Sequence, residues 1–262
     1  MGALKALQRS PGALARNPVL VIPVLVIGLL QLPQLLLQAT NPLLASLVSL
    51  VISLVFVLVM PFFQGGIIGM ADEALDGRTR LQSFIADGKA NYVRMLIAYI
   101  LLLVIGFVLF IVFFIISFVL SILVLPTLDF SGFAVGVMGL VFVISYVPML
   151  LLVFFVQFYG QAIVLGDEGS MDGIRRSVSL VRENLLSTFG YSIIGAIFGG
   201  GIGLVLAGLS MVASPQSAQF FALPEIAFPT LAAAILVVIV LASIIGSGLA
   251  IFSVAFYREI SA

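Results

Sequence analysis

A long stretch without any formal charge limits the folds open to this chain more than any other feature. Between Arg16 and Asp72 lie 55 consecutive residues with no Asp, Glu, Lys or Arg. A single helix crosses a hydrocarbon core of roughly 30 Å with about 20 residues. The stretch is therefore too long for one crossing and must fold back once. Asn41 and Pro42 stand near its middle, and Asn followed by Pro is a start signal for a new helix.

Further uncharged runs follow, each long enough for one tilted span and too short for two. The six predicted spans lie within residues 19–37, 43–68, 95–128, 130–166, 184–224 and 226–257. Four prolines fall inside these spans, where neighbouring helices can compensate for the lost backbone bonds, so we expect kinks there: Pro23, Pro33, Pro61 and Pro148. The predicted fold class is all-α, a polytopic membrane bundle of six transmembrane helices forming one domain over residues 1–262.

The composition agrees with a membrane protein and removes several classes of chemistry. Hydrophobic residues make up 63% of the chain, charged residues 8%, and the mean hydropathy is +1.34, far from the values of a soluble domain. The chain has no Cys and no His. It therefore lacks thiolate nucleophiles, the commonest general base and the commonest transition-metal ligands, and we expect no cofactor. A net charge of zero predicts no nucleic-acid partner.

The basic residues predict the orientation, because Lys and Arg accumulate in the cytoplasmic loops of membrane proteins. All of them precede the first span, follow the last, or lie in alternate loops: Lys5, Arg9, Arg16, Arg78, Arg80, Lys89, Arg94, Arg175, Arg176, Arg182 and Arg258. The opposite side keeps only Asp129 and Glu225. We expect a multi-pass protein of the cell membrane with both termini in the cytoplasm. A secretory signal peptide is the alternative for the N-terminus, but the apolar stretch from Val19 is too long.

A weak internal repeat divides the chain into three units. The segments 10–17, 83–91 and 177–184 each begin with Ser, end with Asn and directly precede a span. Their apolar residues fall on one side, as in short amphipathic helices lying in the membrane interface. The predicted unit is one interfacial helix plus a two-span hairpin, repeated over roughly 1–76, 77–172 and 173–262. Such parallel repeats can surround an axis along the membrane normal; chance similarity among apolar sequences is the alternative.

The stretch AIVLGDEGSMDGIRRSVSLVRENLLSTFGYS, residues 162–192, carries a family resemblance. Over nearly the whole chain the protein resembles an uncharacterised family of six-helix membrane proteins from halophilic archaea. It is more distantly similar to the membrane domain of some glycerophosphoryl diester phosphodiesterases, through the landmarks Glu168, Arg176, Ser177, Leu180 and Asn184. The resemblance implies fold and membrane embedding. It does not imply phosphodiester hydrolysis, which resides in a separate soluble barrel.

Two acidic pairs stand near the cytoplasmic ends of spans two and four, Asp72 with Glu73 and Asp167 with Glu168. Negative charge there opposes the helix dipole and gains from a basic partner, and Arg78, Arg80, Arg175 and Arg176 are close in sequence. One hypothesis is a cation or head-group site shared by two units. The favoured one is structural, with carboxylates that are solvated or paired with Arg, because a hard-cation site needs more oxygen ligands.

Three glutamines of the first span, Gln31, Gln34 and Gln38, share one helix face, and Gln157 and Gln161 form a similar pair in the fourth. These amides are candidates for a polar face in the membrane that lines a solute path. Interhelical hydrogen bonding is the commoner use of such groups.

Gly195, Gly199 and Gly203 recur every fourth residue in span five and predict a strip for close helix packing, against span six or another copy of the chain. Arg175, Arg176 and Arg182 are candidates for contacts with anionic lipid head groups.

No span carries an ionisable side chain at its centre, which argues against proton pumps, voltage sensors and intramembrane hydrolases. We therefore expect a non-enzymatic integral membrane protein that associates with membrane lipids, with other membrane proteins or with itself. The alternative is a passive or weakly coupled transporter for an uncharged or lipid-like solute.

Overall fold

The computed structural model describes residues 2–124, 132–213 and 227–262, and every element in these ranges is a helix. Six helical segments are long and apolar enough to cross a membrane. The model therefore confirms the all-α class and the number of predicted spans. The predicted extracellular acids Asp129 and Glu225 lie outside the described residues.

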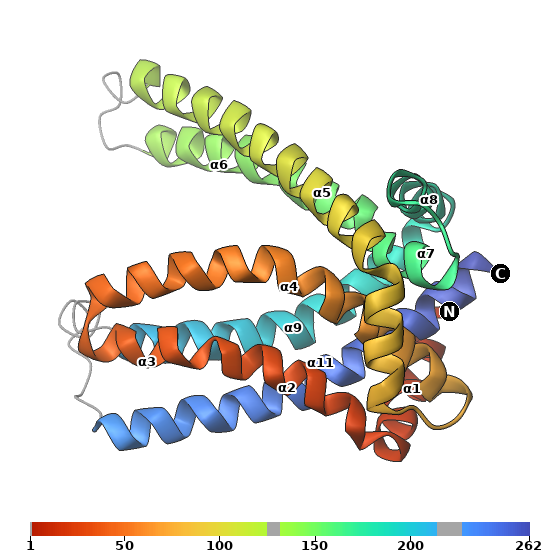
Figure 1. Cartoon of the computed structure of the whole chain (residues 1–262). Coiled ribbons are helices and arrows are strands. Elements are labelled where there is room, and N and C mark those ends of the chain that lie inside the picture. Colours follow the sequence, from red (N-terminus) through yellow and green to blue (C-terminus); the bar gives the residue numbers. More distant parts are fainter. Residues whose placement is uncertain (1, 125–131, 214–226) are drawn as a thin grey trace.

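Each of the three units predicted from the sequence contains both short and long helices. The first unit contains α1 (Gly2–Arg16), the 3-10 turn η1 (Pro18–Leu20), α2 (Val21–Leu30), α3 (Leu32–Thr40) and α4 (Pro42–Asp76). The second contains α5 (Leu81–Val124), α6 (Gly132–Val156) and α7 (Tyr159–Leu165). The third contains α8 (Ser170–Glu183), α9 (Leu185–Ala213) and α11 (Phe228–Ser261). Both termini lie at the same end of the molecule (Figure 1), which also holds α1, α7 and α8 and which we call the polar end.

The turn between the first two spans forms as the sequence predicts. Asn41 ends α3, and its side-chain oxygen accepts a hydrogen bond of 3.0 Å from the backbone N–H of Leu44. Pro42 then occupies the first turn of α4, where its missing N–H costs nothing. Pro61 and Pro148 lie inside continuous helices, whereas Pro23 and Pro33 stand in the first turns of α2 and α3. The first span is therefore two helices that meet at Gln31.

Two of the three predicted interfacial helices are separate helices, α1 and α8; the middle one is not. Residues 83–91 lie near the beginning of α5, a continuous helix of 44 residues. Asn17 is followed by Pro18, whose ring disfavours helical geometry in the residue before it, so α1 ends there. Asn91 is followed by Tyr92, and its amide donates to the carbonyl of Asp87 within the same helix. In Figure 1 the first turns of α5 run across neighbouring helix ends before the helix turns to run beside α6.

The polar end is closed by contacts that follow one pattern. The end of α4 packs on the beginning of α5, α7 packs on α8, and the end of α11 packs on α1. The beginning of α5 and helix α8 thus each lie against the end of the span that precedes them. No span precedes α1, which instead lies against the end of the last span, α11. Most of the buried side chains gather at this end, in clusters that include Phe158, Phe252 and Phe256, and a smaller cluster of Leu231, Ile235 and Ile239 lies near the start of α11.

The outer parts of the spans present apolar side chains to their surroundings. Leu43 at the start of α4 is 76% exposed, and so is Leu204 in the outer half of α9. Exposed Phe, Ile and Val side chains also run along α5, including Phe107, Phe114 and Phe118. A bilayer provides the environment that such a surface requires, so the exterior is that of a membrane protein.

Candidate functional site at the polar end

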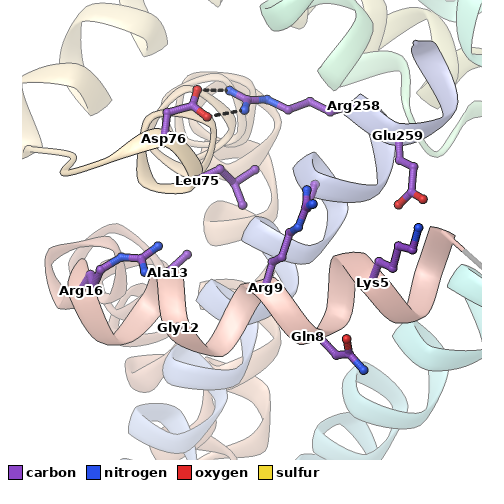
Figure 2. A pocket seen from close by; sticks show the side chains of 11 residues that line it. Lys5, Gln8, Arg9, Gly12, Ala13, Arg16, Leu75, Asp76, Arg258 and Glu259 are labelled. Atoms are coloured by element: carbon purple, nitrogen blue, oxygen red, sulfur yellow. Dashed lines mark hydrogen bonds and ion pairs between the residues drawn. The ribbon is translucent and has the colours of Figure 1, made fainter.

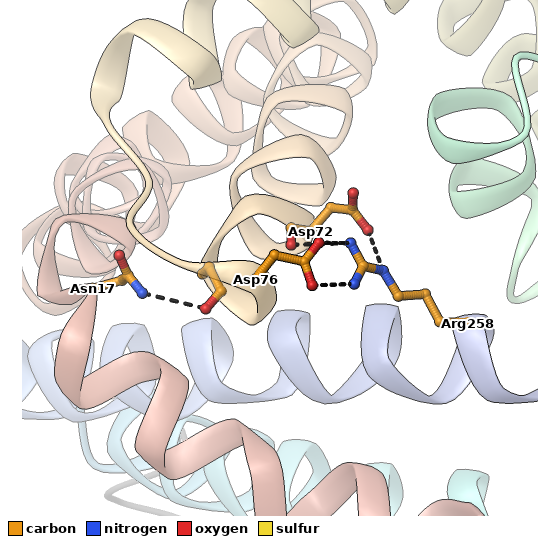
Figure 3. A network of polar contacts seen from close by, with 5 residues as sticks. Asn17, Asp72, Asp76 and Arg258 are labelled. Carbon is orange, nitrogen blue, oxygen red and sulfur yellow. Dashed lines mark hydrogen bonds and ion pairs between the residues drawn. The ribbon is translucent and has the colours of Figure 1, made fainter.

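An arginine near the C-terminus joins the last span to the end of α4. Two guanidinium nitrogens of Arg258 donate to the two carboxylate oxygens of Asp76 at 2.8 and 2.9 Å. Its Nε donates to Asp72 Oδ1 at 2.7 Å, and a further bond of 3.2 Å reaches the Asp72 carbonyl (Figure 3). This bidentate geometry is the strongest form of Arg–carboxylate pairing. It ties together residues more than 180 positions apart in sequence.

Asn17 fastens the turn that follows α4. Its amide nitrogen donates to the carbonyls of Ala13, Ala74 and Gly77, at 3.0, 3.4 and 3.0 Å. Its oxygen accepts from the backbone N–H of Thr79 at 2.9 Å. Only 2% of Asn17 is exposed, so these bonds satisfy groups that water does not reach. Figure 3 shows this residue beside the Arg258 network.

The acidic pairs find distant basic partners, not the neighbouring arginines that the sequence analysis considered. Asp72 pairs with Arg258, while Asp167 pairs with Arg94 of α5. Asp167 has a positive φ of 52°, in the tight turn between α7 and α8. Thr79 donates its hydroxyl to Glu73 at 2.9 Å. The favoured structural interpretation therefore accounts for three of the four carboxylates.

A cavity of about 700 Å³ nevertheless brings part of both acidic pairs together. Asp72 and Glu73 line it with Glu168 and with Asp87 from α5, and Arg176 and Arg258 stand at the same cavity. Within the ranges that the structure describes, no three acidic residues are placed to hold a metal ion. The arrangement is thus a mixed charge cluster between units, and the cation hypothesis gains no ligand set from it.

A second cavity, of about 660 Å³, lies between α1 and the ends of α4 and α11. Lys5, Arg9 and Arg16 line it from one face of α1, and Figure 2 shows Lys5 and Arg9 reaching from that helix toward the end of α11. Asp76, Arg258 and Glu259 complete the wall. We call this cavity the α1 groove.

The two predicted glutamine faces differ. Gln31 is exposed at the junction of α2 and α3, and Gln34 is half-buried in α3. Neither lines the α1 groove or the acidic cavity. Gln38 also belongs to α3, but its side chain lies outside the described part of the structure.

The glutamines of the fourth span bond to the third unit. Gln157 donates to the carbonyl of Phe154 at 2.8 Å and accepts from the hydroxyl of Ser192 at 3.2 Å. Gln161 donates to the Ser253 hydroxyl at 2.7 Å, which also accepts from Tyr191 at 2.8 Å. These bonds join α6 and α7 to α9 and α11, the interhelical use that is common for amides in membranes.

The three candidate head-group arginines of α8 have different surroundings. Arg175 forms a long ion pair of 3.7 Å with Asp172, and both side chains are well exposed. Arg176 lines the acidic cavity. Arg182 lies over the ring of Phe155, with its guanidinium carbon 5.9 Å from the ring centre. They do not converge on one site.

The predicted glycine strip faces outward. A side-chain carbon added at Gly195, Gly199 or Gly203 would meet no atom within 4 Å apart from its own helix. Gly246 of span six instead faces Val24 of α2, at 3.2 Å from such a carbon. Packing of the strip against another copy of the chain therefore stays a prediction.

Sequence reasoning missed the pairing role of Arg258 and the fastening role of Asn17. Ser177 is a third example. Its hydroxyl accepts from the Phe158 N–H at 3.0 Å and donates to the Phe155 carbonyl at 2.9 Å, which satisfies the backbone at the break between α6 and α7. Asn17 and Ser177 are also two of the Ser and Asn positions that define the predicted repeat. The repeat pattern was thus a signal for fastening residues, although it did not reveal their partners.

A family model described as Domain of unknown function (DUF7847) matches residues 1–260. The chain belongs to this family. No curated protein and no solved structure matches it. The matched residues include Asn17 and Arg258.

Replacing Arg258 with Gln is expected to lower the free energy of unfolding by about 1 to 2 kcal/mol. The change leaves Asp72 and Asp76 without their bidentate partner, and the partial exposure of the side chain limits the cost. Thermal unfolding in mild detergent, followed by circular dichroism, measures the loss. Arg175→Gln is the control, since its exposed pair is worth little. Equal losses in the two variants would contradict the structural role of Arg258.

Proposed function

We propose that this chain is a non-enzymatic integral protein of the cell membrane that associates with anionic phospholipid. In this proposal both termini are cytoplasmic, so the polar end faces the leaflet in which anionic lipid concentrates. The proposal adopts the three-unit organisation, which the repeated packing of each short segment on the preceding span supports. It also adopts the resemblance to archaeal six-helix proteins and, more distantly, to phosphodiesterase membrane domains.

The observation that carries the proposal is a groove between α4 and the beginning of α5. Leu58, Val59 and Phe62 form its apolar wall, and Lys89 and Tyr92 complete it, around a volume of about 350 Å³. Tyr92 donates its hydroxyl to the Leu58 carbonyl at 3.1 Å. We call this the α4–α5 groove.

The α4–α5 groove combines an apolar wall with a basic side chain, as binding of the acyl chain and the phosphate of a phospholipid requires. An acyl chain gains from contact with the apolar wall, and a phosphate gains from the lysine, whose side chain forms no ion pair with any described residue. Lys89 is exposed, and it precedes the apolar run of α5 by only a few residues. Lys89 is therefore expected to lie at the depth of the phospholipid head groups, at the membrane surface.

The test measures the phospholipid that stays on the purified full-length chain. The protein is reconstituted in vesicles of phosphatidylcholine and phosphatidylglycerol, extracted in mild detergent and examined by native mass spectrometry. We expect phosphatidylglycerol to be enriched on the protein over its share in the vesicles. Lys89→Gln should lower its occupancy about fivefold, because one basic residue near an anionic surface contributes about 1 kcal/mol.

Arg80→Gln is the matched control, since Arg80 is also exposed, precedes α5 and lies outside the α4–α5 groove. It should leave the occupancy unchanged. Wild-type protein without enriched phosphatidylglycerol would refute the lipid association itself. Equal losses in the two variants would reduce it to general charge attraction and refute the groove.

A further inference from the structure

We infer that the α1 groove is a binding site for a phosphate group, separate from the α4–α5 groove. Its residues come from helices that the rest of the structure already holds together. Asp76 and Arg258 form one wall and satisfy each other through two hydrogen bonds. Ala13 and Ala255 supply small side chains, which leaves room between the helices.

The charges of the α1 groove are not balanced. Because Asp76 is paired with Arg258, the remaining charges are Lys5, Arg9 and Arg16 against Glu259. None of the three cations forms an ion pair with a described residue. In Figure 2 Lys5 points toward Glu259, whereas Arg9 and Arg16 have no carboxylate drawn beside them. An excess of basic side chains in a hollow favours an anion.

The placement of the cations favours a phosphate. Lys5, Arg9 and Arg16 stand on one face of α1, with Gly12 between the two arginines on the same face. A side-chain carbon added at Gly12 would meet nothing within 4 Å, so the space above the helix is open. Arginine forks match the oxygen geometry of phosphate, and a lysine adds a point charge.

A neighbouring face of α1 fixes the helix in place. Ala3, Ala6, Ser10 and Ala13 are buried against the protein, while Leu4 is 62% exposed on the remaining side. The helix is thus held by small side chains and presents its basic face without needing to rearrange. A preorganised site loses less entropy on binding.

Two sources can supply this chemistry: the head group of an anionic phospholipid, or a phosphate in free solution. If the ligand is a lipid head group, the inference deepens the proposed function and rests on it. If the ligand is a free phosphate, the inference is independent of the proposed function. The full-length chain in nonionic detergent is titrated with soluble dioctanoyl phosphatidylglycerol, with dioctanoylglycerol, which has no phosphate, and with inorganic phosphate. Calorimetry gives the affinities.

We expect a phosphate-bearing probe to bind and dioctanoylglycerol to bind at least about tenfold more weakly. The triple variant Lys5→Gln, Arg9→Gln and Arg16→Gln should weaken the binding of that probe by about tenfold or more. The double variant Arg78→Gln and Arg80→Gln removes positive charge from the exposed loop between α4 and α5, outside the α1 groove, and should leave it unchanged. Unfolding temperatures without ligand show whether each variant is folded.

A second pair of variants keeps every lining cation. Gly12→Glu and Gly12→Gln both fill the open space above α1, and both should favour the helix over Gly. Binding to the Glu variant should be about tenfold weaker than to the Gln variant, because only the first adds a negative charge.

The inference is overturned if no phosphate-bearing probe binds the wild type, if the double variant of Arg78 and Arg80 loses as much affinity as the α1 triple, or if the two Gly12 variants bind equally. Binding of phosphatidylglycerol alone assigns the site to a lipid head group. Binding of inorganic phosphate as well shows that a free phosphate suffices. Lys89→Gln lies outside the α1 groove, so a failure here is distinct from a failure of the proposed lipid association.

Discussion

Gly66→Ala is expected to destabilise the protein by about 2 kcal/mol or more, although alanine is the better helix former. A side-chain carbon at Gly66 would lie 2.5 Å from the backbone oxygen of Phe84, and it would also overlap the ring of Phe84. That ring is packed edge-on against Phe62 and Phe63. The backbones of α4 and α5 must therefore separate, and overpacking of this kind typically costs about 1 to 3 kcal/mol.

Gly199→Ala is the matched control, because it is also a helical glycine in a predicted span. An added carbon there would meet no atom within 4 Å. Helix propensity alone then favours alanine by up to about 1 kcal/mol. Unfolding by denaturant in detergent micelles compares the two variants. Similar changes in the two would contradict the close approach of α4 to α5.

Asn17→Ala is expected to lower the free energy of unfolding by about 3 kcal/mol. The substitution removes the partner of a buried backbone N–H at Thr79 and of carbonyls at Ala74 and Gly77. Each buried group left without a partner costs about 1 to 3 kcal/mol, and part of this is recovered where water can enter. Hydrogen exchange at the turn after α4 should rise in the same variant, since that turn loses its fastening.

Asn91, which ends the corresponding segment of the predicted second unit, provides the comparison with Asn17. Asn91→Ala should cost less than about 1 kcal/mol, because the Asn91 amide bonds only to a carbonyl of its own helix. If Asn91→Ala proved as costly as Asn17→Ala, the fastening role of Asn17 would be wrong.

The spans were predictable because lipid imposes a simple rule on sequence. Helices that cross a membrane must be long and nearly free of charge, so the uncharged runs located all six. The turn at Asn41 and Pro42 was equally local, since the cap and the proline act within one helical turn. The continuous α5 was not predicted, because a Ser and Asn pattern at a helix start does not specify a break without a residue such as Pro18.

The charge partners at the polar end depend on tertiary structure. Arg258 meets Asp72 only because α11 returns beside α4, and Arg94 meets Asp167 because α5 passes the turn before α8. Sequence proximity pointed to exposed arginines, Arg78 and Arg80 in the loop after α4 and Arg175 and Arg176 on α8. The α1 groove has the same origin: its basic face was visible in the sequence, but the wall opposite belongs to the far end of the chain.

The contact between α1 and α11 sets an order on biosynthesis. Helix α1 leaves the ribosome before any of the spans, and the small-residue face that it buries mainly against α11 is only partly covered, by α4 and α9, until the last span has been inserted. This helix must therefore wait at the membrane surface while all six spans are made. A ribosome that stalls before residue 228 would leave a chain whose α1 groove has only part of its wall.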